Sequence, residues 1–400
     1  MHNKLSRRQF LRRAGLGLAA GAAAAAGVGG QPVKADPPPF PFYLPVVLAP
    51  PADVVRVHAD AATSWDYLTG WNGDYVSLAT VTAMMERGLR EVTGAATPAA
   101  AWAMLLPGYT PGKKIAVKVN LNNAVKDDAD NIIDALPQVA MALLKTLCVD
   151  FGAAQQDVMI YDAVRPMPGR FYTPVHAAYP QVGLFDNGGG YAPQRATFNH
   201  VDSSLRVTFT QPNMKASRYL TDLLFQATYV INIPILKKHG GHPVTLAFKN
   251  HFGSTQVLGQ IGGVVKDDLH PYISPNNLAY DPAKIPLVDI NANPNIRYKT
   301  VLTIGDGLFG ANAYNGMPVP WFNTFAGQAP NSLIFSRDVV AGDCVMCDLL
   351  RTEFDFAGFP PDSTYDYLVN AEQRGLGRYE KGDPWGAGYN KLKYKVVELI

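Results

Sequence analysis

From residue 113 onward the sequence alternates short apolar segments with longer segments of helical periodicity. Strands are predicted at residues 113–120, 157–161, 205–209, 229–234, 300–304, 332–335 and 394–399. Helices are predicted at residues 136–151, 220–227, 338–351 and 365–374. Short apolar strands that alternate with helices are typical of parallel sheets covered on both faces. The pattern therefore predicts an α/β fold, a single large domain whose largely parallel central sheet is flanked by helices.

The N-terminal region that precedes this pattern indicates an export signal. Arg7 and Arg8 stand in the run Ser-Arg-Arg-Gln-Phe-Leu, a Gly- and Ala-rich stretch follows, and Val33 and Ala35 suit a signal peptidase. We interpret residues 1–35 as a twin-arginine signal peptide. A membrane span needs about 20 strongly apolar residues, so we expect no stable span after cleavage, and a signal retained as an anchor is the alternative. Export predicts the twin-arginine machinery as a partner and a location in the periplasm or on the extracellular face of a prokaryotic cell.

The rest of the chain divides into four segments. Residues 36–53 hold seven prolines and form a Pro-rich linker. Residues 54–112 form an N-terminal layer of the globular domain, residues 113–352 its core, and residues 353–400 a C-terminal helix and strand that pack on the core.

The charge of the chain depends on the signal. Residues 1–35 contain six Lys and Arg residues and no Asp or Glu, so their removal changes the net charge from +2 to −4. The remaining chain has no block of basic residues. This composition argues against nucleic acid as a partner.

The three cysteines do not suffice for a self-contained iron–sulfur cluster or a four-cysteine zinc site. Cys148 lies in an apolar helical pattern and is expected in the core. Cys344 and Cys347 form a CxxC motif on the apolar face of a predicted helix, where the spacing of three favours packing of both thiols in the core. A disulfide or redox pair is the alternative.

Two predicted strands carry polar residues where a buried strand is expected to be apolar. In the first, the period of two places Lys118, Asn120 and Asn122 on one face. That face is either a solvated edge or the wall of a pocket, since ligands of α/β sheets bind outside the carboxyl ends of the strands. The second strand carries Asn232, and we expect this buried amide to brace the loop that follows.

That loop concentrates titratable side chains. Residues 237–251 include Lys237, Lys238, His239, His242, Lys249, Asn250 and His251. Lysines and an amide that converge bind a phosphate or carboxylate, whereas converging histidines bind a transition metal or transfer protons. The run His-Gly-Gly-His has no standard zinc spacing, and a merely solvated loop is the alternative.

The same region carries a resemblance to a known family. Residues 229–253, with Asn-Ile-Pro-Ile-Leu-Lys-Lys-His at a strand end and Thr-Leu-Ala-Phe-Lys-Asn-His-Phe-Gly after it, resemble the signature of the domain of unknown function 362 family. Residues 117–120, 304–307 and 336–343 resemble the opening strand, a later Asp-Gly turn and a helix start of that family. The resemblance covers about residues 113–352. It implies no general activity. Some members carry ferredoxin-like iron–sulfur modules, for which this chain has too few cysteines.

Because the carboxyl ends of neighbouring parallel strands meet at one edge, we expect the polar residues to share a crevice, to which Asp162 and Arg165 also contribute. The expected catalytic residues are His239, Asp306 and Lys237, and the expected ligand-binding residues are Lys118, Asn120, Asn122, Lys249 and Asn250. The candidate ligands of a divalent metal are His239, His242 and Asp306. A turn before Gly307 is the alternative role of Asp306.

Two classes of function fit these residues. The first is an exported enzyme with a metal- or anion-binding crevice, which acts on a small carboxylated or phosphorylated molecule, with redox chemistry as one option. The second is an extracytoplasmic protein that binds a small anion without turnover. The density of titratable groups in one loop favours the enzyme, whereas the lack of a Gly-x-Ser-x-Gly or a Gly-x-Gly-x-x-Gly motif favours the binding protein.

Overall fold

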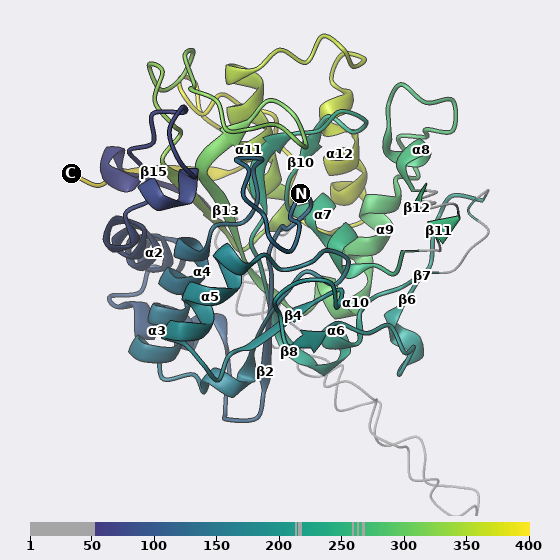
Figure 1. The fold of residues 1–400 in the computed structure, drawn as a ribbon. Coiled ribbons are helices and arrows are strands. Elements are labelled where there is room, and N and C mark those ends of the chain that lie inside the picture. Colours follow the sequence, from purple (N-terminus) through teal and green to yellow (C-terminus); the bar gives the residue numbers. More distant parts are fainter. Residues whose placement is uncertain (1–52, 213, 215–217, 258–259, 262–263, 266–268) are drawn as a thin grey trace, which may run out of the picture. The chain divides into compact units, whose positions relative to one another are not determined.

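A mixed sheet of eleven strands organises the part of the chain that the computed structural model describes (Figure 1). That part comprises residues 53–212, 214, 218–257, 260–261, 264–265 and 269–400. The predicted signal peptide and almost all of the predicted linker fall outside it. The strands of the sheet are β1 (Asp53–His58), β2 (Lys114–Lys118), β3 (Val158–Tyr161), β4 (Gly183–Asp186), β5 (Gln194–Arg195), β8 (Ala227–Asn232), β9 (Ile235–Lys238), β10 (Val244–Thr245), β13 (Thr300–Ala311), β14 (Ser332–Ser336) and β15 (Lys393–Glu398).

The strand order is β15-β1-β14-β13-β8-β2-β3-β4-β5, with β9 paired to β13 and β10 paired to β9. Along this order only β14 runs antiparallel to its neighbours. The four strands β13, β8, β2 and β3 are adjacent and parallel, so the predicted parallel core of the sheet is confirmed. Their carboxyl ends therefore lie at one edge, where ligands of α/β sheets bind.

Helices cover both faces of the sheet. They are α2 (Leu78–Thr93), α3 (Pro98–Leu105), α4 (Pro137–Leu144), α5 (Gly169–Ala178), α6 (Asp222–Gln226), α7 (Ala247–Asn250), α8 (His270–Ile273), α9 (Pro286–Ala292), α10 (Pro294–Arg297), α11 (Val339–Glu353) and α12 (Asp366–Gln373). Neighbouring residues of β1 show the two faces, because Val55 packs in the apolar cluster that includes α2, whereas Val54 packs in the cluster that includes α11. The predicted α/β fold, one domain with a mostly parallel sheet between helices, is confirmed.

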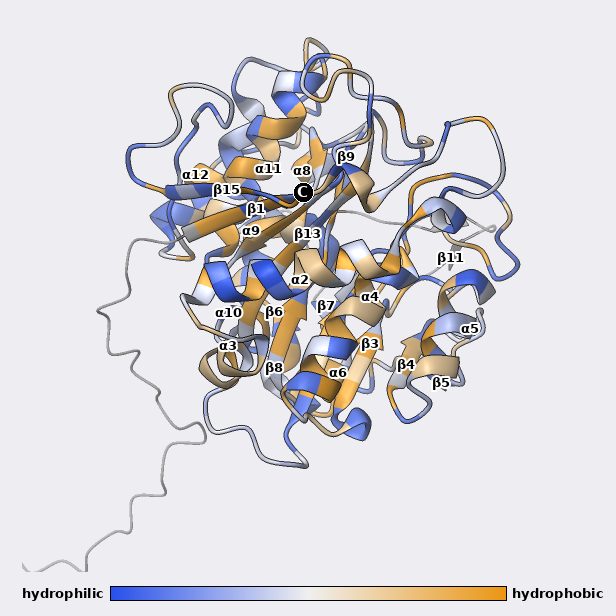
Figure 2. Cartoon of the chain, turned by 90° about the vertical axis from the view of Figure 1, so that its left-hand side faces the viewer, coloured by the Kyte–Doolittle hydropathy of each residue, from blue (hydrophilic) through white to orange (hydrophobic). Residues whose placement is uncertain are grey.

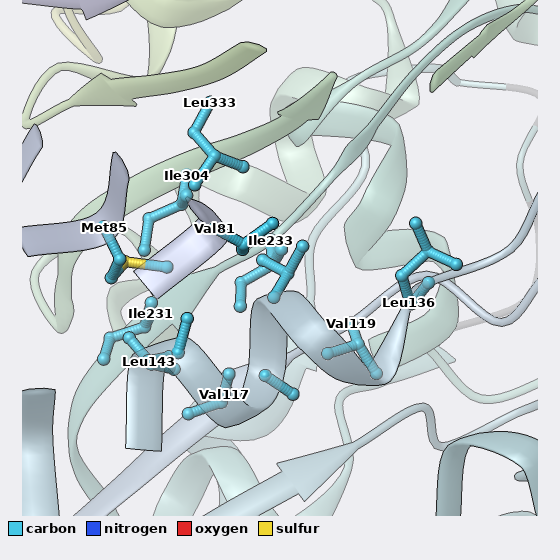
Figure 3. Packing of buried hydrophobic residues seen from close by; sticks show 14 of the residues in the cluster. Val81, Met85, Val117, Val119, Leu136, Leu143, Ile231, Ile233, Ile304 and Leu333 are labelled. Atoms are coloured by element: carbon cyan, nitrogen blue, oxygen red, sulfur yellow. The ribbon is translucent and has the colours of Figure 1, made fainter. Parts of the chain in front are cut away.

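The face under α2 and α4 holds an apolar core. Figure 3 shows Val81 and Met85 of α2 and Leu143 of α4 beside Val117 and Ile231 of the sheet, and all five side chains are buried. In Figure 2 the strands β3 and β8 are mostly hydrophobic, whereas α2 also carries hydrophilic residues. This division is that of an amphipathic helix on a buried parallel sheet.

Several predicted elements differ in extent. The strand predicted at 205–209 does not join the central sheet. Only β6 (Arg206–Val207) forms there, and it pairs with β7 (Arg218–Tyr219) in a separate two-stranded ribbon. A second ribbon joins β11 (Gln260–Ile261) to β12 (Val264–Val265). The helix predicted at 136–151 begins as α4 and continues as a π-helix over Lys145–Asp150.

The cysteines pack as the sequence predicts. Cys344 and Cys347 are free and buried in α11, and Cys148 is free and packs, partly buried, against the core under α2. Burial raises the pKa of both Cys344 and Cys347 well above the usual thiol value, which keeps them protonated and unreactive. Within the described residues, no helix has the length and apolar character needed to cross a membrane.

Candidate functional site

A buried ion pair lies at the carboxyl ends of β2 and β3. The ammonium of Lys118 donates to Asp162 Oδ2 at 2.9 Å, to Asn250 Oδ1 at 3.2 Å and to the carbonyl of Val119. The side chains of Lys118 and Asp162 are only 1% and 4% exposed. Burial lowers the pKa of Lys118, and the carboxylate of Asp162 opposes that shift. Because all three N–H bonds of the ammonium have acceptors, the charged form fits this place.

Two amides extend the network to β8 and α7. Asn250 Nδ2 donates to Asn232 Oδ1 at 2.7 Å and to the carbonyl of Ile233 at 3.2 Å, and Asn232 Nδ2 donates to the carbonyl of Ala247 at 3.0 Å. Asn232 thus braces the segment after its strand, as the sequence predicts. On the other side of α7, Asp343 accepts the backbone N–H groups of Ala247 at 2.8 Å and Phe248 at 3.1 Å, so this aspartate caps the start of α7.

The backbone after α7 closes over the ion pair at Gly253. A Cβ at this position would lie 2.5 Å from Lys118 Nζ and 2.7 Å from Asp162 Oδ1, so only glycine fits. The carbonyl of Gly253 also accepts the N–H of Ala163 at 2.8 Å. This close approach fixes the helical turn His251–Ser254 against the ends of β2 and β3.

A cavity of about 530 Å³ lies above this network. Asn120, Asn122 and Asp162 contribute to its walls from the ends of β2 and β3, and Lys249, Asn250 and Gly253 contribute from α7 and the turn after it. The volume lies within the range of small-molecule sites, about 300–1,000 Å³. The predicted pocket wall on the polar face of β2 is therefore formed by Asn120 and Asn122, whereas Lys118 lies just beneath the cavity.

Cations line this cavity from three parts of the chain. Arg165 follows β3 and its Nη2 donates to Asn122 Oδ1 at 3.0 Å. Arg218, in β7, is buried, and its Nη1 donates to the carbonyl of Gln256 at 3.0 Å. Lys249 Nζ lies 4.1 Å from the centre of the Phe252 ring. Asp162 is the one carboxylate among the described lining residues, and it is paired with Lys118.

His239 lies at the wall of the cavity beside two other rings. Its ring centre is 5.0 Å from that of Tyr314 and 5.8 Å from that of His270. His239 Nδ1 accepts the backbone N–H groups of Gly241 and His242, both at 3.1 Å, so the ring proton belongs on Nε2. Burial, together with the charge of Lys249, lowers the pKa of His239 and keeps the ring neutral. At neutral pH the ring therefore offers an N–H donor and not a base.

Lys237 lies in β9 and is fully buried, away from the cavity lining. Its Nζ donates to the carbonyl of Ile133 at 3.2 Å, and burial lowers its pKa to about 8, with Asp134 opposing the shift. The sequence suggests a loop here because the residues are charged. The backbone instead pairs with β10 and β13.

Asp306 also lies apart from the cavity, which corrects the expectation of one shared crevice. The strand predicted to end at residue 304 continues as β13 through Asp306 to Ala311. Gly305 and Gly307 therefore do not mark a turn. A Cβ on Gly305 would lie 2.5 Å from Met346 Sδ of α11, so that glycine permits close packing of the helix on the strand.

The candidate metal ligands do not form a set. Among the described residues, no three His, Cys, Asp or Glu side chains gather so as to hold a metal ion. His239 faces the large cavity, whereas His242 is buried and its Nδ1 donates to the carbonyl of Val244 at 2.8 Å. Asp306 lines a different, smaller cavity.

Sequence reasoning missed Arg218, His270 and Tyr314. Arg218 belongs to a two-residue strand, and His270 and Tyr314 lie in segments without a strand-end pattern. They reach the cavity only through long-range folding. No local signal in the sequence indicates them.

One protein-family model, described as a domain of unknown function (DUF362), matches residues 115–348, which is more than half of the chain. Comparisons with curated proteins and with solved structures found no match. The matched region begins in β2, ends in α11 and contains all the cavity-lining residues named above.

Proposed function

The chain belongs to the DUF362 family, and we propose that it binds a small carboxylated or phosphorylated molecule in the cavity at the ends of β2, β3 and β8. The observation that carries this proposal is the charge of the lining. Arg165, Arg218 and Lys249 bring three cationic side chains from separate parts of the chain to one cavity. A small anion is the ligand that such a lining suits.

The neutral groups of the lining suit the same ligand. Arginine guanidinium groups bind carboxylates and phosphates with paired hydrogen bonds. The side-chain amides of Asn120 and Asn122 add N–H donors, and His239 presents its Nε2–H. Val164, Val257 and Leu269 supply apolar surface for the rest of the molecule.

Turnover of the bound anion is the second candidate function. The observation that favours it is the group of His239, His270 and Tyr314 at the wall of the cavity. Histidine and tyrosine are frequent proton-transfer groups. With Lys237 and Asp306 away from this cavity, an acid–base step would depend on His270 and Tyr314, while His239 would donate a hydrogen bond to developing negative charge.

We also propose that the protein works outside the cytoplasm. The support is the sequence around Arg7 and Arg8 and the small residues at 33–35. The ligand would then be an anion of the periplasm or of the extracellular medium.

The test measures anion binding by the full mature chain, using inorganic phosphate and citrate as probes in titration calorimetry. We expect Arg165→Gln and His239→Ala each to raise the dissociation constant about tenfold, because each variant loses one hydrogen bond to the charged ligand. The thermal midpoint of the His239→Ala variant should stay within a few degrees of the wild type, because a cavity wall and not the core is changed. Arg87→Gln is the matched control, since Arg87 pairs with Glu91 on the surface of α2.

The proposal fails if neither probe binds, or if the Arg165 and His239 variants bind as the wild type does. If a probe binds, the choice between an enzyme and a binding protein is tested with compounds of the class, phosphate or carboxylate, whose probe binds more tightly. Conversion of a phosphate ester or carboxylic acid by the wild type, abolished in a His270→Gln, Tyr314→Phe double variant that still binds, establishes turnover.

A further inference from the structure

A second cavity lies in the fold apart from the anion cavity. Its volume is about 10 Å³, the space of about one water molecule. Three polar residues, Asn72, Asp134 and Asp306, line it, and Ile235 and Phe309 contribute apolar surface. A space of this size and polarity holds a single small occupant.

Asp134 provides an unsatisfied oxygen at this cavity. The residue is only 7% exposed. Its Oδ1 accepts the N–H of Asn123 at 3.0 Å, whereas its Oδ2 is buried and has no hydrogen-bond partner in the described structure. A buried carboxylate oxygen without a partner is costly, so this atom requires a ligand.

Asp306 brings a second buried carboxylate from β13. It is 3% exposed, and its Oδ1 accepts the N–H of Leu308 at 3.2 Å. Neither Asp306 nor Asp134 forms an ion pair with a described side chain. The N–H groups of the backbone stabilise both carboxylates, but they do not neutralise them.

One buried cation acts on this pair of carboxyl groups. Lys237 influences Asp134, and its Nζ donates to the carbonyl of Ile133 at the cavity wall. Arg170 lies close enough to influence Asp134, but it is paired with Asp128 at 2.8 Å. Lys237 therefore supplies one positive charge beside Asp134, and no described cation pairs with Asp306, so one negative charge is uncompensated in the interior when both carboxyl groups are ionised.

We propose that this cavity binds one monovalent hard cation, Na⁺, through oxygen atoms of Asp134, Asp306 and Asn72. A singly charged ion balances the cluster, whereas a divalent ion would leave an excess of positive charge beside Lys237. Carboxylate and amide oxygens are the ligands that hard cations prefer. The one-water volume excludes an ion that keeps a hydration shell.

The bound cation would stabilise the segment around residues 120–135, which forms part of the wall of the anion cavity. Asp134 holds the backbone N–H of Asn123, and the N–H of Ala135 donates to the carbonyl of Asn120 at 2.8 Å. Asn120 and Asn122, which line the anion cavity, belong to the same segment. Loss of the ion is therefore expected to loosen this wall, although the Na⁺ site itself does not depend on the proposed anion.

The experiment measures the thermal midpoint of the full mature chain in NaCl, LiCl, KCl or N-methylglucamine chloride at constant ionic strength and pH. A ligand that binds only the folded state raises the midpoint with its concentration. We expect a saturable rise of about 2 °C or more with Na⁺, and a smaller rise with K⁺. Asp134→Asn and Asp306→Asn should lose this response. Asp157→Asn, a control at another buried carboxylate directly before β3, should keep it.

If the two aspartate variants fold poorly, two other measurements replace them. Asn72→Ala should reduce the rise of the midpoint with Na⁺, and the wild type should broaden the sodium NMR signal, because bound Na⁺ has a broader line. A midpoint that is equal in all four salts overturns the proposal and leaves a water molecule as the occupant. A midpoint that responds to pH but not to Na⁺ also overturns it, because a proton then neutralises the cluster.

Discussion

Replacement of Lys118 by Met tests whether the floor of the large cavity depends on a buried ion pair. Methionine keeps a linear apolar side chain and removes the ammonium, so Asp162 remains buried without a counter-ion. At 2.9 Å and an effective dielectric constant of about 20, the lost attraction is about 6 kcal/mol. Because the wild type also bears the cost of burying the lysine, we expect a net loss of about 3–5 kcal/mol in the free energy of unfolding.

The strand itself offers a matched control. Lys114 stands at the start of β2 and pairs with Asp157 at 3.1 Å, but its side chain is 34% exposed. Water screens such a pair, so Lys114→Met should cost about 1 kcal/mol or less. Urea denaturation at pH 7, followed by circular dichroism, gives both free energies.

Equal losses in the two variants, or a loss below about 1.5 kcal/mol for Lys118→Met, would refute the reasoning. The double variant Lys118→Met, Asp162→Asn provides a further check. Its neutral amide removes the unpaired charge, so it should regain part of the stability that Lys118→Met loses.

Three further predictions concern the rest of the chain. Cys344→Ala and Cys347→Ala should each lower the free energy of unfolding by about 1 kcal/mol without loss of anion binding, and a thiol titration of the mature protein should find both cysteines free. Burial lowers the pKa of His242 and His251 to about 3, so these histidines bind protons in the unfolded chain but not in the folded one as the pH falls from 6.5 toward 3, and the folded protein should lose stability over that range. The slope of the free energy of unfolding against pH should be shallower in His251→Asn, and an unchanged slope would contradict this. Changing both Arg7 and Arg8 to Lys should leave folded precursor in the cytoplasm, as fractionation would show, and normal export of that variant would disprove the signal.

The elements of the parallel core could be predicted because their signals are local. Apolar runs separated by helical periodicity identified β2, β3, β8 and β13, and the rule that parallel strands end at one edge placed Asn120, Asn122 and His239 at a common cavity. Asn232 could be interpreted correctly because a buried amide needs partners wherever it lies.

The environment of Asp306 could not be predicted from its neighbours. An Asp-Gly pair favours a turn in an isolated peptide, but here β14 pairs with Gly305, Asp306 and Gly307, and Met346 of α11 packs against Gly305. The backbone hydrogen bonds and the close packing together favour the extended strand. Lys237 likewise became part of a strand because β10 and β13 supply its backbone with partners.

The sequence by itself determined the alternation of strands and helices, the apolar faces that form the core and the polar residues at the ends of the parallel strands. Each of these depends on side-chain periodicity or on the chemistry of adjacent residues. Only the tertiary structure decided which polar groups meet. It brought Arg218 and His270 to the large cavity, and it placed Asp134 and Asp306 in the lining of the small one, because contacts between distant segments depend on packing and burial that no local pattern encodes.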